Sequence, residues 1–225
     1  MLDPENPPDF SVETWINTLK APTLADLKGR VVVVAAFQTG CKGSLTHGIP
    51  QAQRVAENFD PRQVVVIGLV TPFENAEGQT KERVEAFAAE HGLMFPIAID
   101  KIVPGQDMTA TMEAYELRGT PSVLVFDRQG RVRRHYLGEA SDIRLASEIM
   151  AMLVEHPEAP RETSMAIERL LHAALVDPDE VAAHQHDHDG GCCGGGHHHH
   201  DHHHEPSHKQ HAHSDGCCSD GSCKT

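Results

Sequence analysis

One cysteine lies far from the others in the chain, at a position where a thiol can be reactive. Cys41 follows the apolar run Val31–Phe37, a pattern typical of a strand buried on both faces, and precedes a predicted helix over residues 42–59. Unpaired N–H groups and the macrodipole at a helix N-terminus favour an anion, so a thiol there has a lowered pKa. The sequence therefore predicts a nucleophilic thiolate at a strand–helix junction.

A second kind of chemistry is concentrated in the last 42 residues, 184–225, which hold 13 of the 18 histidines and five of the six cysteines. Imidazole and thiolate are ligands that Zn, Ni and Cu(I) prefer. No fixed zinc-finger spacing is present, so we expect several divalent transition-metal ions per chain, with Zn or Ni the leading candidates. The candidate ligands are His184, His186, His188, Cys192, Cys193, His197, His198, His199, His200, His202, His203, His204, His208, His211, His213, Cys217, Cys218 and Cys223.

This tail contains no Val, Ile, Leu, Met, Phe, Tyr or Trp, so it cannot bury enough apolar surface to fold, and we expect disorder without a ligand. An affinity tag would be an unbroken His run, whereas this one is broken by Asp201 and Glu205 and interleaved with cysteine. In composition and in its Gly-Cys-Cys-Gly step, the tail resembles that of the SlyD-type nickel-handling prolyl isomerases. No prolyl isomerase domain is expected here.

The elements that must position Cys41 alternate along the chain. Strands are predicted over 31–37, 64–70, 95–99, 122–126 and 132–136, and helices over 42–59, 80–92, 108–117 and 142–153. Pro50 should kink the first helix, because proline lacks an N–H donor. This order predicts an α/β fold with a mixed central sheet covered by helices on both faces.

The expected domain organisation has four parts. Residues 1–14 form a flexible, Pro-rich lead-in, residues 15–155 form the α/β domain, residues 156–180 form a linker with an extra amphipathic helix, and residues 184–225 form the tail. We expect Leu170 and Leu171 of the extra helix to lie in the core, although the pattern leaves open whether this helix packs on its own domain or pairs two chains.

From Trp15 to Leu153 the sequence resembles the thioredoxin superfamily, in particular the TlpA/ResA and AhpC/TSA-like redoxins. The resemblance rests on the strand before Cys41, the Pro50 kink, Gly119-Thr120-Pro121 before a strand, and the closing hairpin across Asp127–Gly130. It implies a thioredoxin-like fold in which Cys41 is the attacking cysteine. It further implies that Pro121 follows a cis peptide bond beside the thiol, and that the Thr120 backbone pairs with a substrate chain.

Two departures from this family bear on the chemistry. Ser44 stands where the second cysteine of the C-x-x-C motif would be, and Gly40 replaces the aromatic residue that usually precedes the first cysteine. A dithiol resolves its own mixed disulfide, whereas a lone thiol needs an outside reductant such as glutathione or a second protein. Ser44 could still donate a hydrogen bond to the thiolate.

The charge pattern narrows the classes of partner. The net charge is −14 with neutral histidine, and no stripe of Lys and Arg is present, which argues against nucleic acid and anionic membrane surfaces. Neither a signal-peptide pattern nor an apolar run of membrane-spanning length is found, so the expected compartment is the cytoplasm. Six cysteines in a reducing compartment favour metal or redox chemistry over structural disulfides.

These features leave two function classes and a combination of them. The first is a cytosolic thiol-dependent redoxin, either a thiol-disulfide oxidoreductase or a peroxide-scavenging antioxidant, with Cys41, Ser44, Thr120 and Pro121 at its site and no organic cofactor. The second is an inactive redoxin fold that carries a nickel or zinc storage or metallochaperone tail, with Cys41 simply a buried residue. In the combination, tail metal controls whether tail thiols can resolve Cys41. Substrate and oligomeric state remain open.

Overall fold

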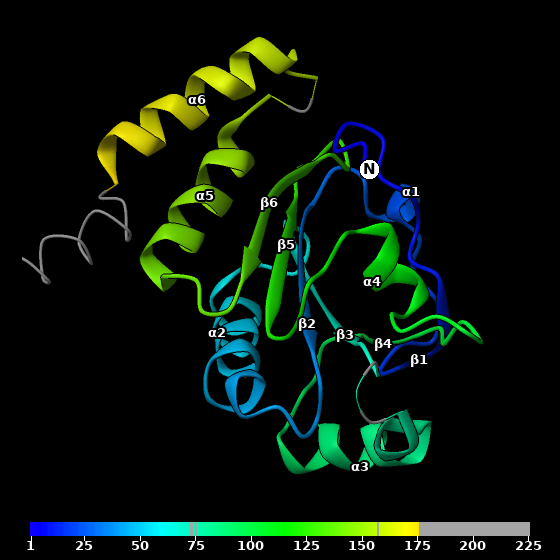
Figure 1. Ribbon diagram of the computed structural model, residues 1–225. Coiled ribbons are helices and arrows are strands. Elements are labelled where there is room, and N and C mark those ends of the chain that lie inside the picture. Colours follow the sequence, from blue (N-terminus) through cyan, green and yellow to red (C-terminus); the bar gives the residue numbers. More distant parts are fainter. Residues whose placement is uncertain (73, 75, 157, 176–225) are drawn as a thin grey trace, which may run out of the picture. The chain divides into compact units, whose positions relative to one another are not determined.

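The computed structural model describes residues 1–72, 74, 76–156 and 158–175, so the predicted tail lies outside the described residues. The described part contains one six-stranded sheet with the order β1-β4-β3-β2-β5-β6 (Figure 1). Its strands are β1 (Val12–Ile16), β2 (Val31–Phe37), β3 (Val64–Val70), β4 (Ile97–Asp100), β5 (Ser122–Phe126) and β6 (Val132–Leu137).

The sheet is mixed, as the sequence predicts. Strands β2, β3 and β4 are parallel, whereas β5 runs antiparallel to β2, β6 antiparallel to β5, and β1 antiparallel to β4. All seven residues of β2 are buried, in agreement with its uninterrupted apolar run. The central strand of the sheet therefore ends close to Cys41, with β3 on one side and β5 on the other.

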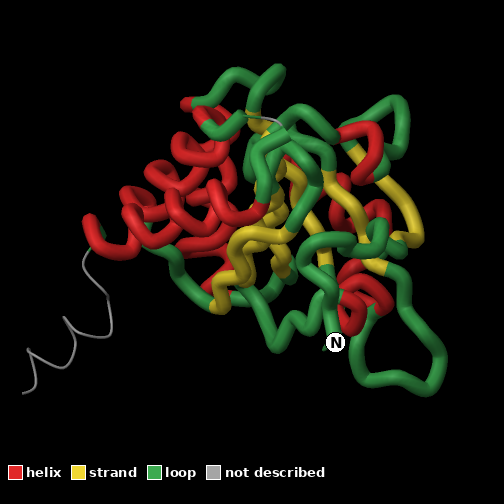
Figure 2. The backbone as a smooth tube through the Cα atoms, turned by 90° about the horizontal axis from the view of Figure 1, so that it is seen from above, coloured by secondary structure: helices red, strands yellow, loops and turns green. Residues whose placement is uncertain are grey.

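Helices cover both faces of the sheet, and Figure 2 shows strands lying between two groups of helices. Alternate side chains of β2 divide between two apolar clusters: Val31 and Val33 pack with residues of α2, α3 and α5, while Val32 and Val34 pack with residues of α1 and α4. The helices are α1 (Leu24–Leu27), η1 (Ser44–Gly48), α2 (Ile49–Asn58), η2 (Ala76–Gln79), α3 (Lys81–Glu90), α4 (Ala110–Ala114), α5 (Asp142–Val154) and α6 (Arg161–Ala174).

The N-terminal segment differs from the expected lead-in over residues 1–14. Val12–Ile16 forms the edge strand β1 and pairs with β4, so the predicted boundary at residue 15 falls inside a strand. Phe10 packs its ring against Tyr115, with 5.7 Å between centroids, and the Val132 amide donates to the Pro4 carbonyl at 2.8 Å. The Pro-rich composition suggested a loose segment, but its few apolar residues cover the face on which α1 and α4 pack.

The extra helix α6 packs on its own domain, and it does so through polar groups. Ser164 is fully buried and accepts a hydrogen bond from Arg131 at 3.1 Å, and Glu168 pairs with Arg133 at 2.6 Å. The expectation that Leu170 lies in the core is wrong, since this side chain is 71% exposed. The apolar stripe of α6 does not define its buried face, because Arg131 before β6 and Arg133 within it bind the polar residues beside that stripe.

Candidate active site around Cys41

Cys41 begins the helical turn that follows β2, four residues after the strand ends. Its amide donates to the Gln38 carbonyl at 3.1 Å, and its carbonyl accepts from the Leu45 amide at 3.0 Å. The residue is partly buried, and it is the only cysteine among the described residues. A thiol in this place is accessible and lies beside the unpaired amides of a first helical turn, as the sequence predicted.

The helical segment expected over residues 42–59, with a kink at Pro50, is divided into two elements in the structure. A π-helical turn over Ser44–Gly48 comes first, and α2 then runs from Ile49 to Asn58 with Pro50 in its first turn. The Ile49 amide donates to the Ser44 carbonyl, five residues back. Pro50 has no N–H to donate to the preceding turn, so the predicted irregularity at this residue takes the form of a wider turn.

The loop before β5 lies against Cys41. The Thr120–Pro121 peptide bond is cis, which confirms the expectation. Because β5 is antiparallel to β2, with Ser122 opposite Ala36, the residue before β5 lies at the edge of the sheet where β2 ends. The Cys41 thiol donates to the Thr120 carbonyl with 3.4 Å between sulfur and oxygen. Residues 79 positions apart thus form one site.

Two glycines of the turn after β2 make room for Pro121. A Cβ atom at Gly48 would lie 2.7 Å from the Pro121 Cβ, and one at Gly43 would lie 3.0 Å from the Pro121 Cδ. Both distances are too short for an undisturbed contact, so side chains at these positions would push the loop away from Cys41. The sequence shows Gly48 only as an interruption of a helix, and the contact with Pro121 could not be read from local spacing.

Ser44 is the group that most favours the thiolate. Burial raises the pKa of the Cys41 thiol, but hydrogen bonds with the Ser44 hydroxyl, the Ser44 amide, the Thr120 side chain and the Gly43 amide outweigh it, and the pKa lies below its ordinary value. Thr120 acts in two ways, because its side chain lowers the pKa of the thiol while its carbonyl accepts a hydrogen bond from the thiol in the protonated form. The Ser44 oxygen itself accepts from the Gln38 amide at 3.4 Å, which fixes the hydroxyl in place.

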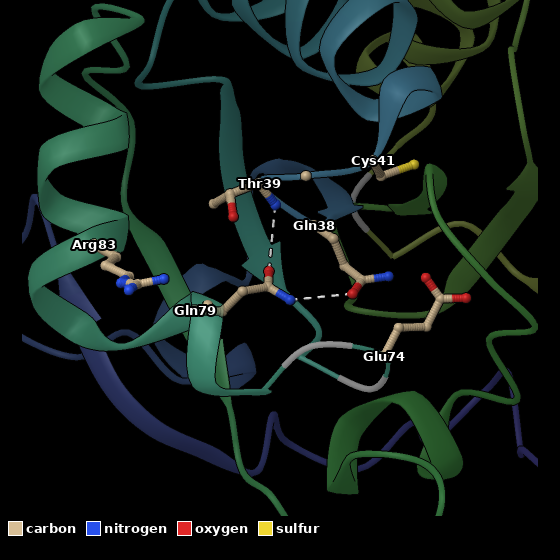
Figure 3. A pocket seen from close by; sticks show the side chains of 8 residues that line it. Gln38, Thr39, Cys41, Glu74, Gln79 and Arg83 are labelled. Atoms are coloured by element: carbon tan, nitrogen blue, oxygen red, sulfur yellow. Dashed lines mark hydrogen bonds between the residues drawn. The ribbon is translucent and has the colours of Figure 1, made fainter.

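Two buried glutamines that the sequence analysis did not single out link three segments of the site (Figure 3). The Gln79 side chain accepts from the Thr39 amide at 3.3 Å and donates to the Gln38 side chain at 3.1 Å. Gln38 in turn donates to the Thr120 hydroxyl at 3.4 Å. This chain of amides ties η2 to the end of β2 and to the loop before β5.

A pocket of about 370 Å³ opens beside the thiol. Figure 3 shows Arg83 and Cys41 on opposite sides of the two glutamines, with Glu74 on the loop that follows β3. Among the residues that the structure describes, the pocket wall is polar and includes the cationic side chain of Arg83 and the anionic side chain of Glu74. Its lining residues are Gln38, Thr39, Gly40, Cys41, Glu74, Gly78, Gln79 and Arg83.

The predicted metal ligands, from His184 to Cys223, all lie outside the described residues. In the part of the chain that the structure describes, no three His, Cys, Asp or Glu side chains are grouped so that they could hold a metal ion. Within the same part, no helix combines the length and the apolar character that a membrane span requires.

Comparison with families and curated proteins places the resemblance in the first part of the chain. Residues 5–135 match the AhpC/TSA family. The chain is 28% identical over 131 residues to thioredoxin-like protein YneN of Bacillus subtilis, a match that covers 58% of this chain and 69% of that protein. It is 30% identical over 122 residues to the thiol-disulfide oxidoreductase ResA of Bacillus anthracis, covering 54% of this chain and 63% of ResA.

Solved structures confirm the thioredoxin-like fold. The crystal structure of a thioredoxin-like superfamily protein matches with a TM-score of 0.65 and 42% identity, covering 68% of this chain and 97% of that one. A thiol-disulfide isomerase from Corynebacterium glutamicum matches with a TM-score of 0.65 and 38% identity, covering 68% of this chain and 98% of that one. In both cases the match spans nearly the whole of the other chain.

We predict that Ser44→Ala raises the pKa of the Cys41 thiol, because it removes the strongest hydrogen bond that favours the thiolate. Since a lowered pKa keeps the thiolate populated as the pH falls, the loss of reactivity on acidification should begin at a higher pH in Ser44→Ala. The measurement is the rate of alkylation by iodoacetamide against pH, in a full-length chain whose five tail cysteines are replaced by serine. Thr46→Ala is the matched control, because that hydroxyl binds only the Lys42 carbonyl; equal profiles for the two variants would contradict the assignment.

A second prediction concerns the close contact between Gly48 and Pro121. Gly48→Ala should lower the free energy of unfolding by about 1–3 kcal/mol, the usual cost of overpacking, because its Cβ would meet Pro121 at 2.7 Å. Gly40→Ala should leave stability nearly unchanged, since a Cβ there meets nothing within 4 Å. Urea unfolding of the two variants tests this. A similar midpoint for both would contradict the prediction, because it would show that the Pro121 loop can move without a loss of stability.

Proposed function

Since this chain belongs to the AhpC/TSA family, we propose that it is a thiol-disulfide oxidoreductase that uses Cys41 as its single redox thiol. The observation that carries the proposal is the placement of Cys41, with its sulfur 3.4 Å from the Thr120 carbonyl and its pKa lowered by Ser44. A lowered pKa and partial exposure both favour disulfide exchange, in which the thiolate is the attacking species. Relatives with the names thiol-disulfide oxidoreductase and thiol-disulfide isomerase support the same reaction class.

The exchange step follows from these groups. The Cys41 thiolate attacks one sulfur of a substrate disulfide, a new sulfur–sulfur bond forms, and the other substrate sulfur leaves as a thiolate. The Ser44 hydroxyl and the amides of Ser44 and Gly43 stabilise the sulfur while it carries charge. Once the Cys41 thiol has lost its proton, the Thr120 carbonyl can accept a hydrogen bond from another donor.

Completion of the cycle needs a thiol from outside the domain. Cys41 is the only cysteine among the described residues, and Ser44 occupies the place from which a second thiol would attack. We propose that an external thiol, such as glutathione or a thiol protein, attacks the mixed disulfide and releases Cys41. Attack by one of the five tail cysteines is the alternative that the sequence offers. This requirement supports a reducing compartment, and we propose the cytoplasm as the site of action.

Peroxide reduction is a second candidate reaction for the same thiolate. Attack on a peroxide oxygen would give a sulfenic acid on Cys41 and release water or an alcohol, after which two outside thiols would restore the thiol. The observation that favours it is the match of residues 5–135 to the AhpC/TSA family.

The C-terminal sequence supports a further proposed activity, the binding of Zn or Ni ions. The interleaved His and Cys residues of 184–225 can form four-coordinate N/S sites in many combinations, each of which releases thiol protons. The acidic residues among them favour a cation further. The proposal rests on the sequence alone, and the redox domain does not depend on it.

Cys41→Ser should abolish disulfide exchange in the full-length chain whose five tail cysteines are already serine, because no other thiol remains. The measurement is mass spectrometry of the adducts formed with a small disulfide and with hydrogen peroxide. The parent with Cys41 intact should gain one mixed-disulfide adduct per chain. If the parent is unreactive at neutral pH, the domain is an inactive carrier for the tail.

The full-length chain should bind several Zn or Ni ions, as measured by equilibrium dialysis. Replacing the five tail cysteines by serine should reduce the number bound, and replacing the 13 tail histidines as well should remove most of it. Binding should weaken as the pH falls through the imidazole range, about pH 6.5, because protonated histidine cannot ligate. Equal metal content in the native chain and the variant without tail His and Cys would contradict the proposal.

A further inference from the structure

The pocket beside Cys41 is lined by two charged side chains, those of Arg83 and Glu74, that form no ion pair with another described residue. Arg83 of α3 is exposed, lines the pocket, and forms no ion pair or hydrogen bond with another described residue. Glu74 lines the pocket in the same way and likewise has no partner within the described part of the chain. Other surface charges of α3 do pair, as Lys81 does with Glu85 at 3.6 Å.

The polar groups between these charges are already occupied. Gln79 uses its carbonyl oxygen on Thr39 and its amide on Gln38, and Gln38 uses its own amide on Thr120. The two glutamines therefore give the pocket a fixed inner wall. A ligand would bind mainly through Arg83 and Glu74, and it would extend from Arg83 towards the sulfur of Cys41 (Figure 3).

We propose that this pocket binds the peptidic part of a small thiol that carries carboxylates and an ammonium group, the chemistry of glutathione. Arg83 would pair with a carboxylate and Glu74 with the ammonium group. A volume of about 370 Å³ is of the size that small-molecule sites have, and it suits part of a tripeptide better than a folded protein surface. The inference rests on the proposed thiol-disulfide exchange and names the outside thiol that would release Cys41 from its mixed disulfide.

The redox step is balanced without any further reactant. The Cys41 thiolate attacks one sulfur of oxidised glutathione, the sulfur–sulfur bond breaks, and one glutathione thiolate leaves while the other half stays bound to Cys41. A second reduced glutathione then attacks the bound glutathione sulfur, which restores the Cys41 thiolate and regenerates oxidised glutathione. Arg83 acts in both directions, since each passes through the same mixed disulfide.

The test compares two disulfides on two variants. In the full-length chain with the five tail cysteines replaced by serine, Arg83→Ala should slow mixed-disulfide formation with oxidised glutathione by about fivefold, the effect of losing one partly exposed ion pair. The same variant should react at the parent rate with hydroxyethyl disulfide, which carries no charge. Lys81→Ala removes the same charge from the same helix but lies outside this pocket, so it should leave both rates unchanged.

Glu74→Gln provides a second readout. It should reduce the preference for oxidised glutathione over dithiodipropionate, because the latter has carboxylates but no ammonium group. An Arg83→Ala rate equal to the parent rate, or an equal loss with both disulfides, would overturn the pocket proposal while Cys41 exchange stands. A parent chain that reacts with neither disulfide would overturn the proposed function together with this one.

Discussion

The antiparallel pairing of β5 with β2 is the constraint on which the reactive site depends. β2 runs towards the edge of the sheet where Cys41 follows it, and β5 begins at that edge directly after Pro121. With a parallel β5 the Thr120 carbonyl would lie at the opposite edge, far from the sulfur. Glycine at 43 and 48 then allows Pro121 to approach the turn, because neither position has a Cβ atom to block it.

The chemistry of the thiol depends on Ser44 in two ways. By replacing the second cysteine of the motif, Ser44 removes the internal route for resolving a mixed disulfide. Its hydroxyl and amide also lower the pKa of Cys41 against the effect of burial. In the proposed exchange the reductant has to reach this sulfur, and a polar pocket begins beside it.

At the end of the sheet away from Cys41, buried ion pairs connect the β5–β6 hairpin to the C-terminal helices. Arg133 pairs with Asp127 at 3.1 Å, with Glu155 at 2.9 Å and with Glu168 at 2.6 Å, so the hairpin and the last two helices share one guanidinium group. Such a network stabilises only when every charge is paired, which demands exact placement of α6. Since Asp127 follows β5 and Pro121 precedes it, this network and the thiol are separated by the length of a strand.

The sequence by itself determined the buried central strand, the reactive position of Cys41 and the loop at Thr120–Pro121. The first two follow from local pattern, an apolar run and a thiol at the start of a helix, whereas the place of the Thr120–Pro121 loop beside the thiol was implied by the resemblance to the thioredoxin superfamily. Tertiary structure decided that Gly48 contacts Pro121 and that Gln79 forms a hydrogen bond with Gln38. It also decided that α6 packs on the domain through Ser164 and Glu168 while Leu170 stays exposed. The physical reason is that a local pattern reports how one element hydrogen-bonds and buries its own apolar face. Which distant residue comes to lie against that element is set by strand order and by partners elsewhere in the chain.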